Sequence, residues 1–234
     1  MSVSEAPGWY GKIASLGDFA SRRLPASLIA NLDTWLQGVI HESRARLGES
    51  WLEAYLTGPV WRFLLFPGAA APEGWAGVLM PSVDKVGRYF PLLIASRQEA
   101  FPDGAAGRAL EDWLDRAEAI ALATLADRAT VEGFDQALQD CRPQSAPPPP
   151  ESPPLDALFT RSITTNHLAP GASLGDALQG LGRTRLHRDA HGHSLWWAPQ
   201  GSEGARVLIT VPGLPDGATF ATLLRGGPDR PESP

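Results

Sequence analysis

The 234-residue sequence is short of cysteine and of long apolar segments, and each shortage excludes a class of protein. Its single cysteine, Cys141, rules out an intramolecular disulfide, so nothing indicates a disulfide-stabilised secreted domain. No apolar run is long enough to cross a membrane, and residues 1–8 lack the charged start and apolar core of a signal peptide. We therefore expect a cytoplasmic protein that does not insert directly into a membrane.

Positive charge is also scarce. Lys12 and Lys85 are the only lysines among 20 basic residues, and the formal net charge is -6. Such a protein has no overall field that attracts nucleic acid or anionic lipid, so we expect no nucleic-acid partner. Hydrophobic residues make up 43% of the chain, which is enough for a core and excludes disorder throughout. The length suits one large domain.

Three short apolar runs in the middle of the chain predict strands. They span 60–66, 75–80 and 89–95, are rich in residues favoured in strands, and are separated by Pro and Gly. The polar segment 81–88 is typical of a hairpin connection between the second and third runs. Together they predict the centre of an antiparallel sheet that is buried on both faces. A shorter strand is expected at 8–13.

Helices are predicted on either side of this central region in the sequence. Apolar residues recur at three- and four-residue spacing from Pro25 to Gly48, and a shorter helix is expected at 49–56. Residues 103–129 and 131–138 also have helical composition. Because strands and helices do not alternate as a doubly wound sheet requires, we predict an α+β fold. It has a mostly antiparallel central sheet with helices packed on both sides.

A proline-rich tract sets the predicted organisation. Residues 1–141 form the expected α+β core, and residues 142–154, with four consecutive prolines, are typical of a linker or surface loop. A docking site for a proline-recognition domain is the less favoured interpretation. Residues 155–226 hold too few strands for a core of their own, so we expect them to pack on the first sheet. Their predicted elements are a helix at 174–181, strands at 194–198 and 206–211, and a helix at 217–225. Residues 227–234 are expected to be a disordered tail.

No arrangement of titratable residues predicts an active site. His187, His191 and His193 form the densest group of possible metal ligands. They lie in a polar turn without a further ligand, so a solvated turn is favoured and we expect neither a metal nor a cofactor. Asp18 and Asp84 are the best carboxylate pair for acid and base catalysis. Arginines close to both in sequence favour structural ion pairs instead.

Nucleophilic and phosphate-loop motifs are also missing. Cys141 has no nearby histidine, and no nucleophile motif surrounds Ser82, whose hydroxyl is expected to satisfy backbone groups of a turn. The Gly-Lys pair ending at Lys12 does not make a Walker A loop, because Ala6 and Ile13 replace the residues that such a loop needs. We therefore expect no catalytic residues.

Several motifs occur in a characteristic order over residues 9–126. They are GWYGK at 8–12, GDF at 17–19, WL at 35–36, PVWRF at 59–63, GVLMPSVD at 77–84 and VGRYFPL at 86–92. In order and spacing they resemble the TagF/ImpM family, whose members are accessory proteins of bacterial type VI secretion systems.

The resemblance implies a non-enzymatic cytoplasmic protein that represses secretion after translation by binding the forkhead-associated scaffold protein Fha. It supplies no catalytic residue and no interface. Polar positions within the two strongest motifs nevertheless suggest where the partner binds. The predicted partner-binding residues are Gly17, Asp18, Phe19, Arg22, Asp84 and Arg88. The alternatives are a metal- or carboxylate-dependent hydrolase and a structural component of the secretion apparatus.

Overall fold

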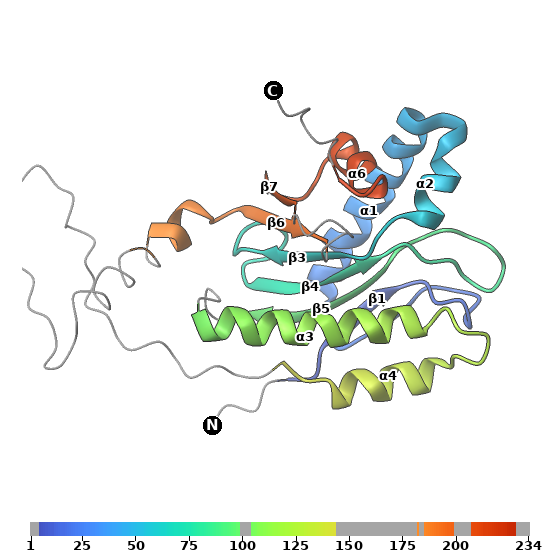
Figure 1. Ribbon diagram of the computed structural model, residues 1–234, viewed down its shortest axis with the longest axis horizontal. Coiled ribbons are helices and arrows are strands. Elements are labelled where there is room, and N and C mark those ends of the chain that lie inside the picture. The colour runs from blue at the N-terminus through green and yellow to red at the C-terminus, as the bar shows by residue number, and fades with distance from the viewer. Residues whose placement is uncertain (1–4, 99–103, 144–181, 183–184, 199–206, 228–234) are drawn as a thin grey trace, which may run out of the picture.

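A single antiparallel sheet of seven strands, in the order β2-β1-β5-β4-β3-β6-β7, forms the centre of the protein (Figure 1). The computed structural model describes residues 5–98, 104–143, 182, 185–198 and 207–227. The strands are β1 (Gly8–Gly11), β2 (Ala20–Arg22), β3 (Trp61–Leu65), β4 (Gly74–Met80), β5 (Leu92–Gln98), β6 (His193–Trp197) and β7 (Leu208–Pro212). The helices are α1 (Ala26–Leu47), α2 (Trp51–Thr57), α3 (Gly104–Ala123), α4 (Val131–Asp140) and α6 (Gly217–Leu224), with a 3₁₀ turn η1 (Gly48–Ser50) between the first two.

The three central apolar runs form neighbouring strands, as predicted. Every residue of β3 and β4 is buried, because helices cover both faces of the sheet at this point. The third strand begins at Leu92 and not at Tyr89. Tyr89 belongs to the connection, where it forms an isolated bridge with Val83. Residues 81–91 are therefore the expected hairpin connection, longer than the sequence indicated.

Two helical layers bury the two faces of the sheet. Helices α1, α2 and α6 lie on one face, and α3 and α4 lie on the other (Figure 1). Since side chains alternate along a strand, each strand contributes to both cores. In β3, Phe63 packs in the first core and Leu64 in the second. This arrangement confirms the predicted α+β class with helices on both sides.

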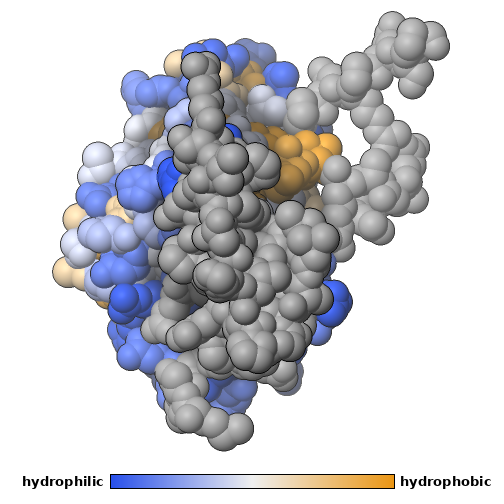
Figure 2. Space-filling view, turned by 90° about the vertical axis from the view of Figure 1, so that its left-hand side faces the viewer, coloured by the Kyte–Doolittle hydropathy of each residue, from blue (hydrophilic) through white to orange (hydrophobic). Residues whose placement is uncertain are grey.

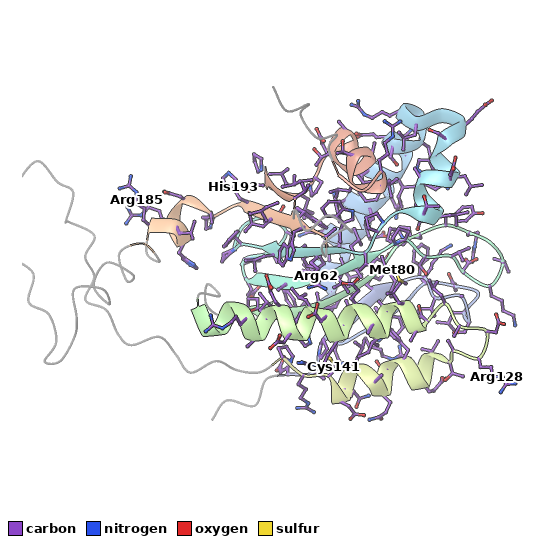
Figure 3. The ribbon with its side chains drawn as sticks, viewed as in Figure 1. Arg62, Met80, Arg128, Cys141, Arg185 and His193 are labelled. Carbon is purple, nitrogen blue, oxygen red and sulfur yellow. The ribbon has the colours of Figure 1, made fainter. Side chains whose placement is uncertain are left out.

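A buried arginine also joins the sheet to α3. Arg62 reaches from β3 toward that helix (Figure 3), where its guanidinium pairs with Asp115 at 2.6 Å and Glu118 at 2.7 Å. A buried guanidinium is tolerated when carboxylates complete its hydrogen bonds. The pairs therefore tie α3 to the sheet in addition to the apolar contacts of that face.

The C-terminal strands extend the same sheet. β6 pairs with β3, β7 pairs with β6, and α6 packs on α1. The Trp61 indole N–H donates to the Leu223 carbonyl at 2.8 Å, which ties the central sheet to α6. The prediction that these strands add to the first sheet is confirmed. The proline-rich residues 144–154, the helix predicted at 174–181 and the tail from 228 lie outside the described residues.

The predicted helices are present, with small differences at their ends. Pro25 is the cap of α1 instead of its first residue, and Gly48, with φ +52°, ends the helix. α3 stops at Ala123 and not at 129, because the Thr124 and Leu125 N–H groups bond to carbonyls three residues earlier. In the part of the chain that the structure describes, no helix has the length and apolar character needed to span a membrane.

Gly77 generates the first testable prediction. A Cβ there would lie 1.9 Å from the Ile94 carbonyl oxygen and 2.7 Å from Phe63 Cζ, so neighbouring strands must separate to admit it. We expect Gly77→Ala to lower the free energy of unfolding by about 3 kcal/mol or more. Gly38, on the exposed side of α1, has open space at its Cβ position. The matched Gly38→Ala should raise stability by about 0.5–1 kcal/mol, and urea unfolding measures both; equal effects would contradict the packing described.

Candidate protein-interaction surface

Two loops that carry the strongest sequence motifs meet at one end of the sheet. Residues 12–19 connect β1 to β2, and residues 81–91 connect β4 to β5. Because β1 pairs with β5, both loops leave the sheet at the same end (Figure 1). The Lys85 N–H donates to the Leu16 carbonyl at 2.8 Å, which joins the loops directly.

A buried carboxylate lies between these loops. Asp84 Oδ2 accepts from Lys12 Nζ at 2.8 Å and from Arg88 Nε at 2.7 Å. Asp84 Oδ1 accepts from the backbone N–H groups of Val86 and Arg88, at 3.0 and 2.9 Å. The side chain of Asp84 is 0% exposed and that of Lys12 is 5% exposed. Lys12, Asp84 and Arg88 are referred to below as the loop anchor.

The electrostatics of the loop anchor argue against acid–base chemistry at Asp84. Burial would raise the pKa of the Asp84 carboxyl, but the hydrogen bonds from Lys12, Arg88 and the Val86 N–H hold it well below its usual range. A general acid or base needs a pKa near the working pH. Asp84 is instead a permanently charged group that holds its loop in shape.

Further hydrogen bonds fix the backbone around the loop anchor. The Arg88 guanidinium donates to the Gly17 carbonyl, and the Ser82 hydroxyl donates to the Lys12 carbonyl at 2.8 Å. The Tyr55 hydroxyl of α2 donates to the Ser82 carbonyl at 2.9 Å and accepts from the Ser82 N–H at 3.0 Å. The loop 81–91 is therefore held by the neighbouring loop and by α2.

Phe19 presents an aromatic ring beside these polar contacts. Its ring stacks on Tyr10 with centroids 6.0 Å apart, meets Phe90 edge-on at 4.7 Å, and lies 4.8 Å from Lys12 Nζ. The Tyr10 hydroxyl in turn donates to Asp33 of α1. Phe19 nevertheless remains 43% exposed. A ring that is packed on several sides and open on another is suited to bind a partner with little loss of side-chain entropy.

The structure brings four of the six predicted residues into one connected group, namely Gly17, Phe19, Asp84 and Arg88. Asp18 is exposed and accepts a hydrogen bond from the Phe19 N–H. Arg22 lies on β2 with its guanidinium 5.9 Å from the Trp9 ring. No atom lies within 4 Å of a Cβ built on Gly17, so the turn there does not depend on glycine for space.

Sequence reasoning missed three members of the group, Lys12, Tyr10 and Phe90. Lys12 belongs to the GWYGK motif and to the rejected phosphate loop, but it was not predicted to pair with a carboxylate, although it is one of two lysines in the chain and follows a buried strand. A cation in such a position needs a buried anion. The sequence therefore indicates that Lys12 needs a carboxylate partner, but it does not identify which carboxylate.

The histidine group is dispersed over three different local structures. His187 belongs to helical residues 185–189, His193 begins β6, and His191 lies against Gly68 of the β3–β4 loop. His193 Nδ1 is 3.0 Å from the His191 carbonyl oxygen, so this ring interacts with backbone. Over the described ranges, no group of three or more His, Cys, Asp or Glu side chains is arranged to hold a metal ion.

Cationic and apolar groups face outward from the two loops. Within residues 12–22 and 81–91 there are four basic and two acidic residues, in a chain whose net charge is -6. Lys85 is exposed, and Val86 beside it is 67% exposed. The loop-end surface is defined here as Asp18, Phe19, Lys85, Val86 and Arg88; Arg22 is left out because it lies by Trp9, whose ring packs on α4. An aromatic and an aliphatic side chain with an arginine near them are typical of protein–protein contacts.

Residues 8–141, which include both motif loops, match the family model of the TagF N-terminal domain, described as type VI secretion system-associated. The chain belongs to the TagF family. It is also similar to PA0076 from Pseudomonas aeruginosa PAO1, whose crystal structure superimposes with a TM-score of 0.74 at 34% sequence identity. That alignment covers 97% of this chain and 98% of PA0076. A search of functionally curated proteins gives no match.

Membership of the TagF family confirms the resemblance found in the motifs and identifies an accessory protein of the type VI secretion system. The matched segment ends at Cys141, at the end of α4, before β6, β7 and α6. The likeness to PA0076 extends over these C-terminal elements as well.

The low pKa of Asp84 gives a prediction about acid stability. The folded-state pKa is depressed below the unfolded value of about 3.9, so this group stabilises the fold at neutral pH and the contribution is lost as pH falls below about 4. We expect Asp84→Asn to be less stable than the wild type at pH 7 and to lose less stability between pH 5 and pH 3. Urea unfolding at these pH values measures the difference.

Two comparisons make that experiment decisive. Asp18→Asn changes an exposed carboxylate of the neighbouring loop and should keep the wild-type pH dependence. Asp135, whose pKa is lowered to about 2 chiefly by hydrogen bonds from Arg23, remains in every variant and accounts for some residual dependence. An Asp84→Asn protein with the full acid dependence of the wild type would contradict the role given to the loop anchor.

Proposed function

We propose that this TagF-family protein is a cytoplasmic, non-enzymatic repressor of type VI secretion that acts after translation. It binds the forkhead-associated scaffold protein Fha through the loop-end surface. The observation that carries the proposal is the meeting of the two strongest family motifs in one surface that is fixed from inside and exposed outside.

The rigidity of the loops supports a binding role. Asp84 receives four hydrogen bonds, and its two loops are joined by further backbone contacts. A surface that is already ordered avoids much of the entropy cost of association. Phe19 and Val86 can then supply apolar contact area that is not offset by ordering the loops.

The charge of the same surface favours a partner of opposite sign. Lys85 and Arg88 are exposed, whereas Asp84 is buried and neutralised within the loop anchor. Complementary charge speeds association and selects the orientation of a complex. We therefore expect the contacting face of the scaffold to combine acidic side chains with an apolar patch.

The proposal includes no catalytic activity, because Asp84, the best candidate for a general acid or base, is held in its charged form. Asp84 is committed to two cations and cannot accept a proton near neutral pH. Asp18 is engaged with the Phe19 N–H on the surface. These two environments favour a structural role for both carboxylates over the hydrolase alternative.

Substitutions on the loop-end surface test the interface. We expect Val86→Asp and Lys85→Glu each to weaken binding of purified Fha at least tenfold, about 1.4 kcal/mol, because both side chains point outward. Arg88→Ala and Asp18→Ala should also weaken binding. Isothermal titration calorimetry, or a pull-down with purified proteins, measures the loss, and circular dichroism checks that each variant is folded.

The matched control is Arg116→Ala, which removes an exposed arginine of α3 on another part of the surface. It should bind Fha as the wild type does. Folded Asp18→Ala, Arg88→Ala and Val86→Asp proteins with unchanged affinity would refute the interface while leaving repression itself open to the secretion assay.

Repression makes its own prediction in cells. Deleting the gene should increase secretion of a type VI substrate into the medium, because the scaffold is no longer sequestered. A structural component of the apparatus predicts the opposite, loss of secretion. Immunoblotting of culture supernatants separates the two, and complementation with the Lys85→Glu variant should fail to restore repression if binding through this surface is required.

A further inference from the structure

The two edges of the sheet differ in their protection against pairing with another chain. β2, at one edge, has only three residues and includes Arg22. The following Arg23 pairs with Asp135 of α4 at 2.7 Å. β7, at the other edge, has five residues and carries no charged side chain. Short length and charge are the usual means of keeping an edge strand from pairing, and β7 has neither.

The hydrogen-bond register shows which backbone groups of β6 face which neighbour. The His193 carbonyl accepts from the Phe66 N–H, on the β3 side of β6. Since backbone groups of successive residues point to opposite sides of a strand, those of Ser194 and Trp196 point toward β7. Their partners there are Val211 and Ile209.

The remaining residues of β7 direct their backbone groups away from the sheet. Leu208 and Thr210 alternate with the paired residues, so their N–H and C=O groups point to the open edge. Pro212 lies in the same register but offers only a carbonyl, since proline has no N–H. Among the described residues, no strand pairs with this side of β7.

Apolar side chains accompany this open edge. Leu208 is 60% exposed, and Trp197, opposite to it on β6, has a buried indole N–H without a hydrogen-bond partner in the part of the chain described. One side of the molecule carries a strongly hydrophobic area (Figure 2). An edge with unpaired main-chain groups and an exposed leucine is suited to accept an additional strand.

We propose that the open edge of β7 pairs with β7 of a second copy of this chain. The two strands run antiparallel about a two-fold axis, which joins two seven-stranded sheets into one. With Thr210 opposite its counterpart, the two residues exchange both N–H···O bonds. The Leu208 N–H of each copy then donates to the partner's Pro212 carbonyl. The Leu208 side chain packs beside the partner's Pro212 ring, which covers part of the leucine.

The chemistry of β7 favours its own copy as the occupant. About this two-fold axis Thr210 meets its own copy and Leu208 meets the partner's Pro212, so a strand rich in charge would bring its charged side chains together across the pair. Leu208–Pro212 carries none. Pairing through one five-residue strand buries less than the roughly 800 Å² per partner of a standard interface. The dimer should accordingly be weak and should dissociate on dilution.

This inference is independent of the proposed function. β7 lies at the edge of the sheet opposite to β2 and β1, and the loop-end surface begins from β1, β4 and β5. Failure of one proposal leaves the other intact.

Sedimentation velocity of the full chain over a wide concentration range tests the dimer. The wild type should move from the 25.0 kDa monomer toward twice that mass as concentration rises. Thr210→Pro removes an outward N–H without removing a bond to β6, and should stay monomeric. Leu208→Lys replaces the exposed leucine of the edge strand with a charged side chain, which opposes strand pairing, and should also stay monomeric. Thr210→Val keeps the backbone donor and should dimerise as the wild type does.

Three results would overturn the proposal. They are a wild type that is monomeric at the highest concentration, a Thr210→Pro protein that still dimerises, and protection of the Leu208 and Thr210 amides from hydrogen exchange in a monomer. Such protection would mean that the open edge of β7 already pairs with another segment of the same chain. Thermal unfolding of all variants confirms that each is folded, and Leu208→Lys tests the edge even if Thr210→Pro fails to fold.

Discussion

Asp84 is a charged carboxylate with no exposed side-chain surface. It connects its own loop to the loop of Lys12, which lies 72 residues away in the sequence. A buried charge is tolerated only when cations and hydrogen bonds satisfy it, so separating the loops would leave Asp84 unpaired. The sheet must bring the strand ends together for this contact to form. Gly11 allows it, because a Cβ there would lie 2.1 Å from the Pro91 carbonyl oxygen. The shape of the loop end thus depends on one anion and on the glycine that lets β1 approach β5.

The helices and strands that are best predicted from the sequence are those whose buried side chains form apolar runs or recur at regular spacing. The strands β3 and β4 and the helix α1 follow from apolar runs and from three- and four-residue spacing. β2 was missed because Ala20–Arg22 contains no apolar run and is held by backbone pairing with β1. The order of the strands in the sheet could not be predicted either. More than a hundred residues separate β3 from β6, and no sequence pattern indicates that these two strands pair.

The candidate site was predictable as a set of motif residues but not as a geometry. The motifs identified Asp84 and Arg88, which are four residues apart and contact each other. Lys12 escaped because its partner lies far along the chain, and spacing in sequence does not encode long-range ion pairs. The choice between an acid–base role and a structural role for Asp84 depends on the same long-range geometry. Only the surrounding donors reveal that its pKa is lowered and not raised.

The residues of the two motif loops consequently divide by the direction of their side chains. Lys12, Asp84 and Ser82 point inward and determine the loop conformation. Phe19 and Val86 point outward, and little else in the structure depends on Val86. Because the inward group satisfies its own polar atoms, the outward group is left free to contact another protein. In the interface that we propose, such a motif supplies the contact through its outward residues, while its inward polar residues fix the shape of the loops.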